Sequence, residues 1–164
     1  MSMVVADSTP LINLAAIRRF NLLRRLYEQI VIPRAVYQEV VVRGQGRAGA
    51  NEVRAAVSTW ISIAEPEDTL AVDALAAELA RGEAEAIILA KEQEAQILLI
   101  DEIRGRRIAK QLGLKVRGTL GVLSEAKHQG LVSSVKEEMD RLRSHGAWIH
   151  QELYELVLRL VGEA

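Results

Sequence analysis

Apolar positions are grouped most clearly in the segment 82–113. Residues 84–90 are apolar almost all the way round a helix, which is typical of a buried helix. Residues 97–100 form a continuous apolar run without alternation, which favours a central strand covered on both faces. The run ends at the two carboxylates of Asp101 and Glu102, and a further helical segment follows. The pattern therefore predicts a helix, a strand and a helix, with acids at the strand end where open α/β sheets bind ligands.

The rest of the chain alternates short apolar runs with helical patterns. Further strands are expected at 3–6, 29–32, 60–64 and 115–117. Further helices are expected at 10–17, 34–42, 51–57, 70–80, 119–127, 133–143 and 151–161, with a basic helical turn within 18–25. Segment 43–50 is glycine-rich and basic, which is typical of a flexible loop or linker. Alternation of strands and helices indicates an α/β fold with a mainly parallel sheet between helices.

Composition narrows the classes of protein that fit this pattern. The chain has 164 residues, of which 49% are hydrophobic, so it can bury one sizeable core. Aromatic residues make up only 4%, which leaves little material for base-stacking platforms. The absence of cysteine excludes disulfides, thiolate metal sites and a cysteine nucleophile, and it fits a reducing, cytoplasmic environment. No signal peptide or membrane-spanning run is evident, and the net charge of −1 means that attraction to nucleic acid must be local.

Four carboxylates fall at positions that suggest a shared site. Asp7 follows the first strand, Asp101 follows the central strand, and Glu39 and Glu85 lie on helices expected at the same edge. Mg²⁺ and Mn²⁺ prefer hard oxygen ligands of this kind, and such ions can activate water for phosphodiester hydrolysis. Each acid taken alone also has an ordinary structural explanation, because the chain contains 22 acidic residues and glutamates are common at helix starts.

The two glutamates at the start of the buried helix are alternatives for one position. Glu83 and Glu85 are two residues apart and therefore lie on different helix faces. One of them can point into the pocket while the other faces solvent, and their spacing does not say which. Asp101 and Glu102 are a stronger indication of a functional site, because two adjacent acids at the end of an apolar strand contribute little to stability.

Other chemistries are less well supported. His128, His145 and His150 lie in the last third of the chain and lack a metal-ligand spacing. No nucleophile elbow, P-loop or dinucleotide-binding fingerprint occurs. A phosphatase or receiver with Asp7 or Asp101 as phosphoacceptor stays possible, although Thr9 stands where a second acid would be expected.

Several motifs together resemble those of PIN-domain proteins. They are VVADSTPLINL, PRAVYQEV, GEAEAI, LLIDE and GTLGVL, and they cover about residues 3–130 in the family's order. The resemblance is closest to a branch of uncharacterised, predicted nucleic-acid-binding proteins and extends to the VapC-type toxins of toxin–antitoxin pairs. It implies a three-layer α/β/α fold and a ribonuclease that uses Mg²⁺ or Mn²⁺.

The resemblance also assigns roles to individual residues. The family's acids fall on Asp7, Glu39, Glu85 and Asp101, which would serve as catalytic residues and metal ligands. Glu83, which competes with Glu85 for one position, and Glu102 are auxiliary candidates. The chain departs from the family pattern in two places, since many members carry Asp at the position of Glu85 and this branch often carries a second Asp at that of Glu102. Ser8, Thr9, Arg104 and Arg107 are candidates for RNA binding, and the nearby Arg43, Arg47, Arg106 and Lys110 could also contact phosphates.

The resemblance leads to further expectations about organisation and partners. Residues 1–130 are expected to form the PIN-like domain, and residues 131–164 a helical extension packed on it. An RNA substrate, a small antitoxin protein and a homodimer are the expected partners. The Glu-for-Asp differences support one alternative, in which the chain is a PIN-like module that binds RNA or regulates without cleaving it.

Overall fold

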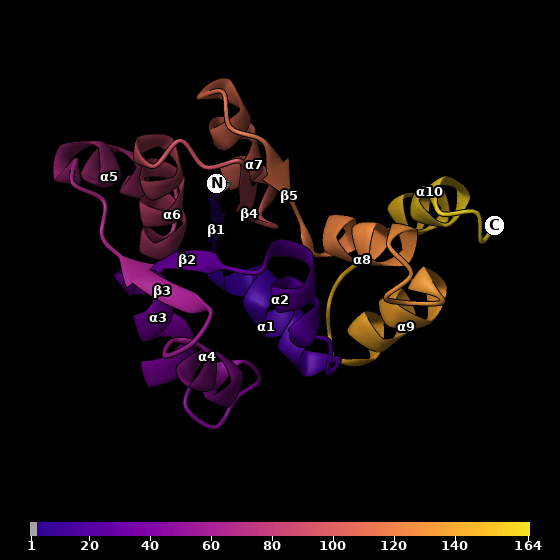
Figure 1. Cartoon of the computed structure of the whole chain (residues 1–164). Coiled ribbons are helices and arrows are strands. Elements are labelled where there is room, and N and C mark those ends of the chain that lie inside the picture. Colours follow the sequence, from indigo (N-terminus) through magenta and orange to yellow (C-terminus); the bar gives the residue numbers. More distant parts are fainter. Residues whose placement is uncertain (1–2) are drawn as a thin grey trace.

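The computed structural model describes residues 3–164 and contains one sheet of five parallel strands (Figure 1). The strands are β1 (Val4–Ala6), β2 (Ile30–Pro33), β3 (Ile61–Ala64), β4 (Ile97–Leu99) and β5 (Val116–Arg117). Their order in the sheet is β3-β2-β1-β4-β5, so β1 is the central strand. Each strand lies where the apolar runs predicted it. Residues 1 and 2, which the predicted first domain includes, lie outside the described part of the chain.

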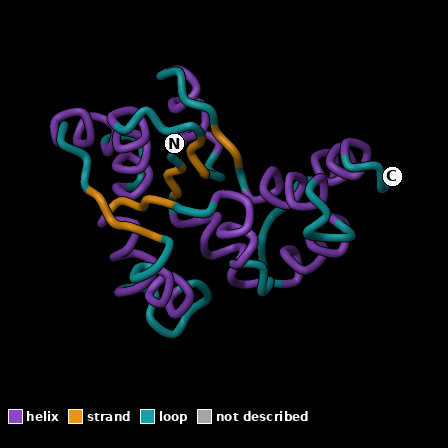
Figure 2. The backbone as a smooth tube through the Cα atoms, viewed as in Figure 1, coloured by secondary structure: helices purple, strands orange, loops and turns teal. Residues whose placement is uncertain are grey.

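Helices cover both faces of this sheet (Figure 2). They are α1 (Ser8–Ala16), α2 (Asn21–Tyr27), α3 (Arg34–Tyr37), the π-helix η1 (Gln38–Val42), α4 (Ala50–Ala56), α5 (Thr69–Ala76), α6 (Arg81–Glu92), α7 (Ile103–Gln111), α8 (Thr119–His128), α9 (Val135–Ser144) and α10 (Gln151–Leu160). Val4 and Ala6 pack with α1, α2 and α8 on one face, whereas Val5 packs with α6 and α7 on the other. The alternation of side chains along β1 therefore produces the predicted three-layer α/β/α arrangement.

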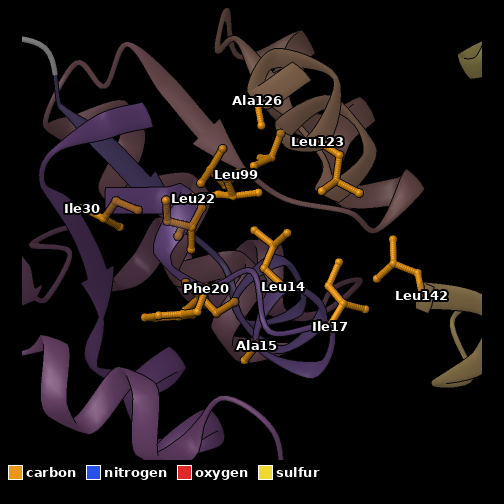
Figure 3. Packing of buried hydrophobic residues seen from close by; sticks show 14 of the residues in the cluster. Leu14, Ala15, Ile17, Phe20, Leu22, Ile30, Leu99, Leu123, Ala126 and Leu142 are labelled. Carbon is orange, nitrogen blue, oxygen red and sulfur yellow. The ribbon is translucent and has the colours of Figure 1, made fainter. Parts of the chain in front are cut away.

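The larger hydrophobic cluster extends from the sheet to the C-terminal helices (Figure 3). Leu99 of β4 and Leu14 of α1 belong to this cluster, and so do Met139 and Leu142 of α9. Phe20 and Trp60 meet in it as a tilted aromatic pair, with ring centroids 5.4 Å apart. The helices after residue 130 therefore share the core of the sheet instead of forming a separate one.

The segment predicted as a single helix over 34–42 is divided into α3 and the π-helix η1. The Arg43 N–H donates to the carbonyl of Gln38, five residues earlier, at 2.8 Å. The sequence of η1 ends in three consecutive valines, whose β-branched side chains disfavour a regular α-helix. Single π-turns are frequent at functional sites, and this one carries the candidate residue Glu39.

Within residues 3–164, none of the helices is both long enough and apolar enough to cross a membrane.

Glu163 connects the end of the chain to the start of α9. Its carboxylate accepts hydrogen bonds from the Val135 N–H at 2.7 Å, the Lys136 N–H at 3.0 Å and the Lys127 ammonium at 2.8 Å. A carboxylate at a helix N-terminus also interacts favourably with the helix dipole. Burial opposes the charge of Glu163, but these donors lower its pKa from 4.5 to about 2.

Glu163→Gln is expected to lower the free energy of unfolding by about 1–2 kcal/mol at neutral pH, because it removes charge-assisted hydrogen bonds. A depressed pKa contributes stability that is present above the unfolded value of 4.5 and is lost as the pH falls toward 2. The difference from wild type should therefore shrink between these two pH values. Thermal unfolding across this range measures it, with the exposed Glu155→Gln as control. A difference that does not depend on pH would contradict the role of the carboxylate charge.

Candidate active site

The pairing of β1 with β4 brings Asp7 and Asp101 to the same edge of the sheet. Ala6 is in register with Leu99, and the Asp7 N–H donates to the Leu99 carbonyl at 2.9 Å. Asp101 follows Leu99 by two residues, so both acids lie just beyond the carboxyl ends of neighbouring strands. β2 and β3 lie on one side of β1 in the sheet, whereas β4 and β5 lie on the other side. In open α/β sheets, the point at which the strand order reverses in this way forms a crevice that binds ligands.

Glu39 reaches this edge from η1, beside the start of α6. A Cβ built on Gly82 would lie 3.5 Å from Oε1 of Glu39 and 3.7 Å from Oδ1 of Asp7. The two carboxylates therefore border the same space over Gly82, which a side chain at this position would begin to fill. Glycine at this position keeps that space open.

The structure distinguishes the two glutamates of α6. Oε2 of Glu83 is buried and has no hydrogen-bond partner, while Oε1 accepts from the Ala80 N–H at 3.3 Å. Burial raises the pKa of Glu83, and the neighbouring Glu102 and Glu39 carboxylates raise it further. Glu83 therefore belongs to the acidic cluster.

Glu85 is engaged elsewhere. Its Oε1 accepts from the Ala35 N–H at the start of α3 at 3.4 Å, and its Oε2 accepts from Nε of Arg81 at 3.2 Å. These contacts connect α6 to α3. The sequence left open which of the two glutamates faces the pocket, and the metal-binding role that the resemblance gave to Glu85 stays a prediction. In the structure both Glu85 oxygens are held by donors outside the cluster.

Asp7 experiences the charge of the whole cluster. Asp7 is buried, with only 4% of its surface exposed to solvent. Burial raises the pKa of Asp7 to about 7, and the charges of Glu83, Glu39 and Asp101 contribute in the same direction, against a hydrogen bond with the Ser8 backbone. Carboxylates from three other segments thus act on Asp7 at this edge.

Asp101 is held by donors that the sequence analysis did not identify. Oδ1 accepts from the Thr119 N–H and Oδ2 from the Thr119 hydroxyl, both at 2.6 Å. The Asn13 amide donates to Oδ2 at 3.4 Å and to the Thr119 hydroxyl at 3.3 Å. A Cβ on Gly118 would lie only 2.6 Å from Oδ1, so glycine is needed for this close approach. The signal available in the sequence was the pair Gly118-Thr119 directly after a short strand.

The remaining candidates differ in their burial and contacts. Ser8 is buried with a hydroxyl that has no partner, whereas Thr9 is exposed. Glu102 is exposed and its carboxylate accepts from the Arg104 N–H at 3.2 Å, at the start of α7. Arg104 and Arg107 lie on α7 and are exposed, and so are Arg43 and Arg47 in the loop after η1.

The donor set fits a hard divalent cation. Among the described residues, 3–164, no three His, Cys, Asp or Glu side chains are already grouped as metal ligands. Carboxylate oxygens are nevertheless the donors that Mg²⁺ and Mn²⁺ prefer, and the buried Oε2 of Glu83 lacks any other partner. A cation there would offset the burial, and the negative charges of the neighbouring carboxylates, that raise the pKa of Asp7.

Two surface hollows lie away from these acids. They have volumes of about 460 and 590 Å³, and both are lined by Arg18 near the end of α1. Neither is lined by a residue of the acidic cluster. The candidate active site is therefore located by the carboxylates that lie together, and the volumes of these two hollows do not indicate it.

Thr119→Val is expected to lower the free energy of unfolding by about 1–3 kcal/mol, because Oδ2 of Asp101 loses its nearest donor. Thr119→Ser retains a hydroxyl and should stay within about 1 kcal/mol of wild type. Chemical denaturation of the two variants makes the comparison. Equal stability of the two variants would contradict the role of this hydroxyl as a donor to Asp101.

A family model described as a PIN domain matches residues 3–163, which is almost the whole chain. No curated protein matches the chain. PIN domains are generally nucleases, and the parallel five-stranded sheet between helices is consistent with this fold. The family that the sequence motifs resembled is confirmed, whereas a relation to VapC-type toxins stays a prediction. The chain belongs to the PIN-domain family.

Proposed function

We propose that this PIN domain is a divalent-metal-dependent endoribonuclease. The convergence of four carboxylates at the carboxyl ends of β1 and β4 supports this proposal most directly. They belong to Asp7, Glu39, Glu83 and Asp101. Glu83 takes the place first given to Glu85, because the Glu85 oxygens bind Ala35 and Arg81.

Asp7, Glu39 and Glu83 are the residues that would hold Mg²⁺ or Mn²⁺, with Asp101 beside them. A bound ion would supply Lewis acidity and lower the pKa of a water molecule for attack on a phosphodiester. Hydrogen bonds within the protein hold two of these carboxylates in position. Thr119 and Asn13 fix both oxygens of Asp101, and the backbone bond between Asp7 and Leu99 fixes the position of Asp7.

Exposed arginines on α7 would bind the RNA backbone. Arg104 and Arg107 are three residues apart, which places them on the same side of a helix that begins just after Asp101. Guanidinium groups bind phosphate oxygens without reading the base sequence. Ser8 and Thr9, at the start of α1, are further candidates for contacts with the substrate.

The resemblance to VapC-type toxins motivates a cellular role. We infer that the chain is the toxin of a toxin–antitoxin pair, acts on RNA in the cytoplasm and is restrained by a small antitoxin protein. The helices after residue 130 are proposed as an extension of the catalytic domain, since they share its core. Expression that arrests growth, and rescue by the product of an adjacent small gene, would support this role.

A non-cleaving RNA-binding or regulatory module is the second candidate. It is favoured by the side chain at position 83, where one glutamate oxygen is engaged by the Ala80 N–H. A carboxylate that partly caps its own helix has less freedom to ligate an ion. Retention of RNA in a gel shift without product formation would favour this candidate over the nuclease.

Glu83→Gln is expected to weaken Mn²⁺ binding at least tenfold and to abolish RNA cleavage, because it replaces a charged oxygen ligand by an amide. Asp7→Asn and Asp101→Asn should have the same effects. Calorimetric titration with Mn²⁺, followed by incubation of the same samples with a mixed RNA substrate, measures both properties.

Glu85→Gln is the matched control for this experiment. It carries the same substitution two residues along the same helix, at a side chain that binds Ala35 and Arg81. It should reduce stability slightly and leave Mn²⁺ affinity and cleavage within about twofold of wild type. Loss of metal binding in Glu85→Gln but not in Glu83→Gln would contradict the assignment, and a wild type that binds no Mn²⁺ would contradict the proposed function.

Replacing Arg104 and Arg107 together by Gln is expected to weaken RNA binding about tenfold while Mn²⁺ affinity is unchanged. The slope of log affinity against log salt should become shallower by about one to two, because fewer counterions are released. RNA binding at several salt concentrations, in a cleavage-deficient Asp7→Asn background, measures this. An unchanged slope would place the RNA elsewhere on the surface.

A further inference from the structure

The C-terminal helix α10 has two apolar faces. Tyr154, Val157 and Leu158 are buried against the rest of the molecule. Leu153, Leu156 and Leu160 form a second row and are 45%, 42% and 75% exposed. Spacings of three and four residues place this row on one side of the helix, over about 10 Å of its length.

An exposed tryptophan precedes α10 in the sequence. Trp148 lies just before α10 and its residue is 88% exposed. Exposed apolar side chains that share one helix face mark interaction sites, and tryptophan is among the residues that contribute most to binding at interfaces. Figure 1 shows α10 beyond α8 and α9, away from the sheet, so a partner bound there would leave the acidic edge free.

Two charges beside the row indicate which partner fits. Glu152 and Arg159 are both exposed, and no ion pair within residues 3–164 involves either of them. They are seven residues apart, which is two helical turns, so they lie on the same flank of the leucine row. The flank therefore carries a negative charge at one end and a positive charge at the other.

We propose that α10 pairs in antiparallel orientation with α10 of a second copy of this chain. A two-fold axis beside Leu156 places Leu153 of each copy between Leu156 and Leu160 of the other, as in knobs-into-holes packing. The same axis places Glu152 of each copy next to Arg159 of the other. A parallel pair would instead place the two charged flanks on opposite sides of the helix pair, where Glu152 of one copy could not reach Arg159 of the other. The charges thus make this surface complementary to itself in one orientation.

The expected affinity follows from the size of the surface. One short helix with a neighbouring tryptophan offers less than the roughly 800 Å² per partner that stable complexes bury. The dimer should therefore dissociate on dilution through the micromolar range. This pairing does not depend on the nuclease chemistry, because it uses none of the acidic cluster.

Sedimentation of the full chain over a series of concentrations tests the proposal. Wild type should pass from monomer to dimer, and the emission of the exposed Trp148 should shift to shorter wavelength as it does so. Leu156→Glu should remain monomeric at every concentration. Leu70→Glu, at a leucine of α5 that is 79% exposed, is the matched control and should dimerise like wild type. Circular dichroism and thermal unfolding confirm that each variant is folded.

Charge reversal tests the orientation. Glu152→Arg and Arg159→Glu should each weaken the dimer about three- to tenfold, because each places like charges together twice per dimer. The double variant exchanges the charges and should restore wild-type affinity. A monomeric wild type, or a dimer that survives Leu156→Glu, would overturn the proposed surface. A double variant weaker than both single variants would overturn the antiparallel pairing.

Discussion

The parallel pairing of β1 with β4 is the constraint on which the site depends. The register that places Ala6 opposite Leu99 also places the two following acids beyond the same sheet edge. The backbone bond from Asp7 to Leu99 continues the ladder by one residue and fixes the first carboxylate. A shift of one residue would exchange the two faces of β1 and disrupt the packing of Val5 against α6, so the hydrophobic core itself maintains the position of the acids.

Carboxylates gathered in this way oppose folding. Burying Asp7 among like charges raises its pKa to about 7, which means that its charged form is disfavoured in the folded chain. Asp101 is compensated by the hydroxyl and N–H of Thr119, but Oε2 of Glu83 has no donor. Polar groups left without partners are rare in protein interiors and concentrate where a ligand completes them. The absence of a donor at Oε2 of Glu83 therefore supports the proposal that a cation binds beside Glu83 and Asp7.

The sequence was sufficient for features that depend on local pattern. Apolar runs predicted the strands, and the acids that follow two of them lie together because strand ends in a parallel sheet share an edge. Spacing could not show which of Glu83 and Glu85 faces the acidic cluster. That depends on where α6 begins and on the Ala35 N–H and the Arg81 guanidinium, which donate hydrogen bonds to Glu85. Asn13 was missed for a similar reason. Its contact with Asp101 spans 88 residues and arises only when α1 packs beside the start of α8.

The C-terminal helices connect stability to assembly. Glu163 follows α10 and binds the first N–H groups of α9, so it holds the end of α10 against the start of its neighbour. Tyr154, Val157 and Leu158 pack against the rest of the molecule, which leaves the leucine row exposed on the other side of α10. The proposed self-pairing therefore uses the helix face that packing within one chain leaves uncovered, and Glu163 lies outside it.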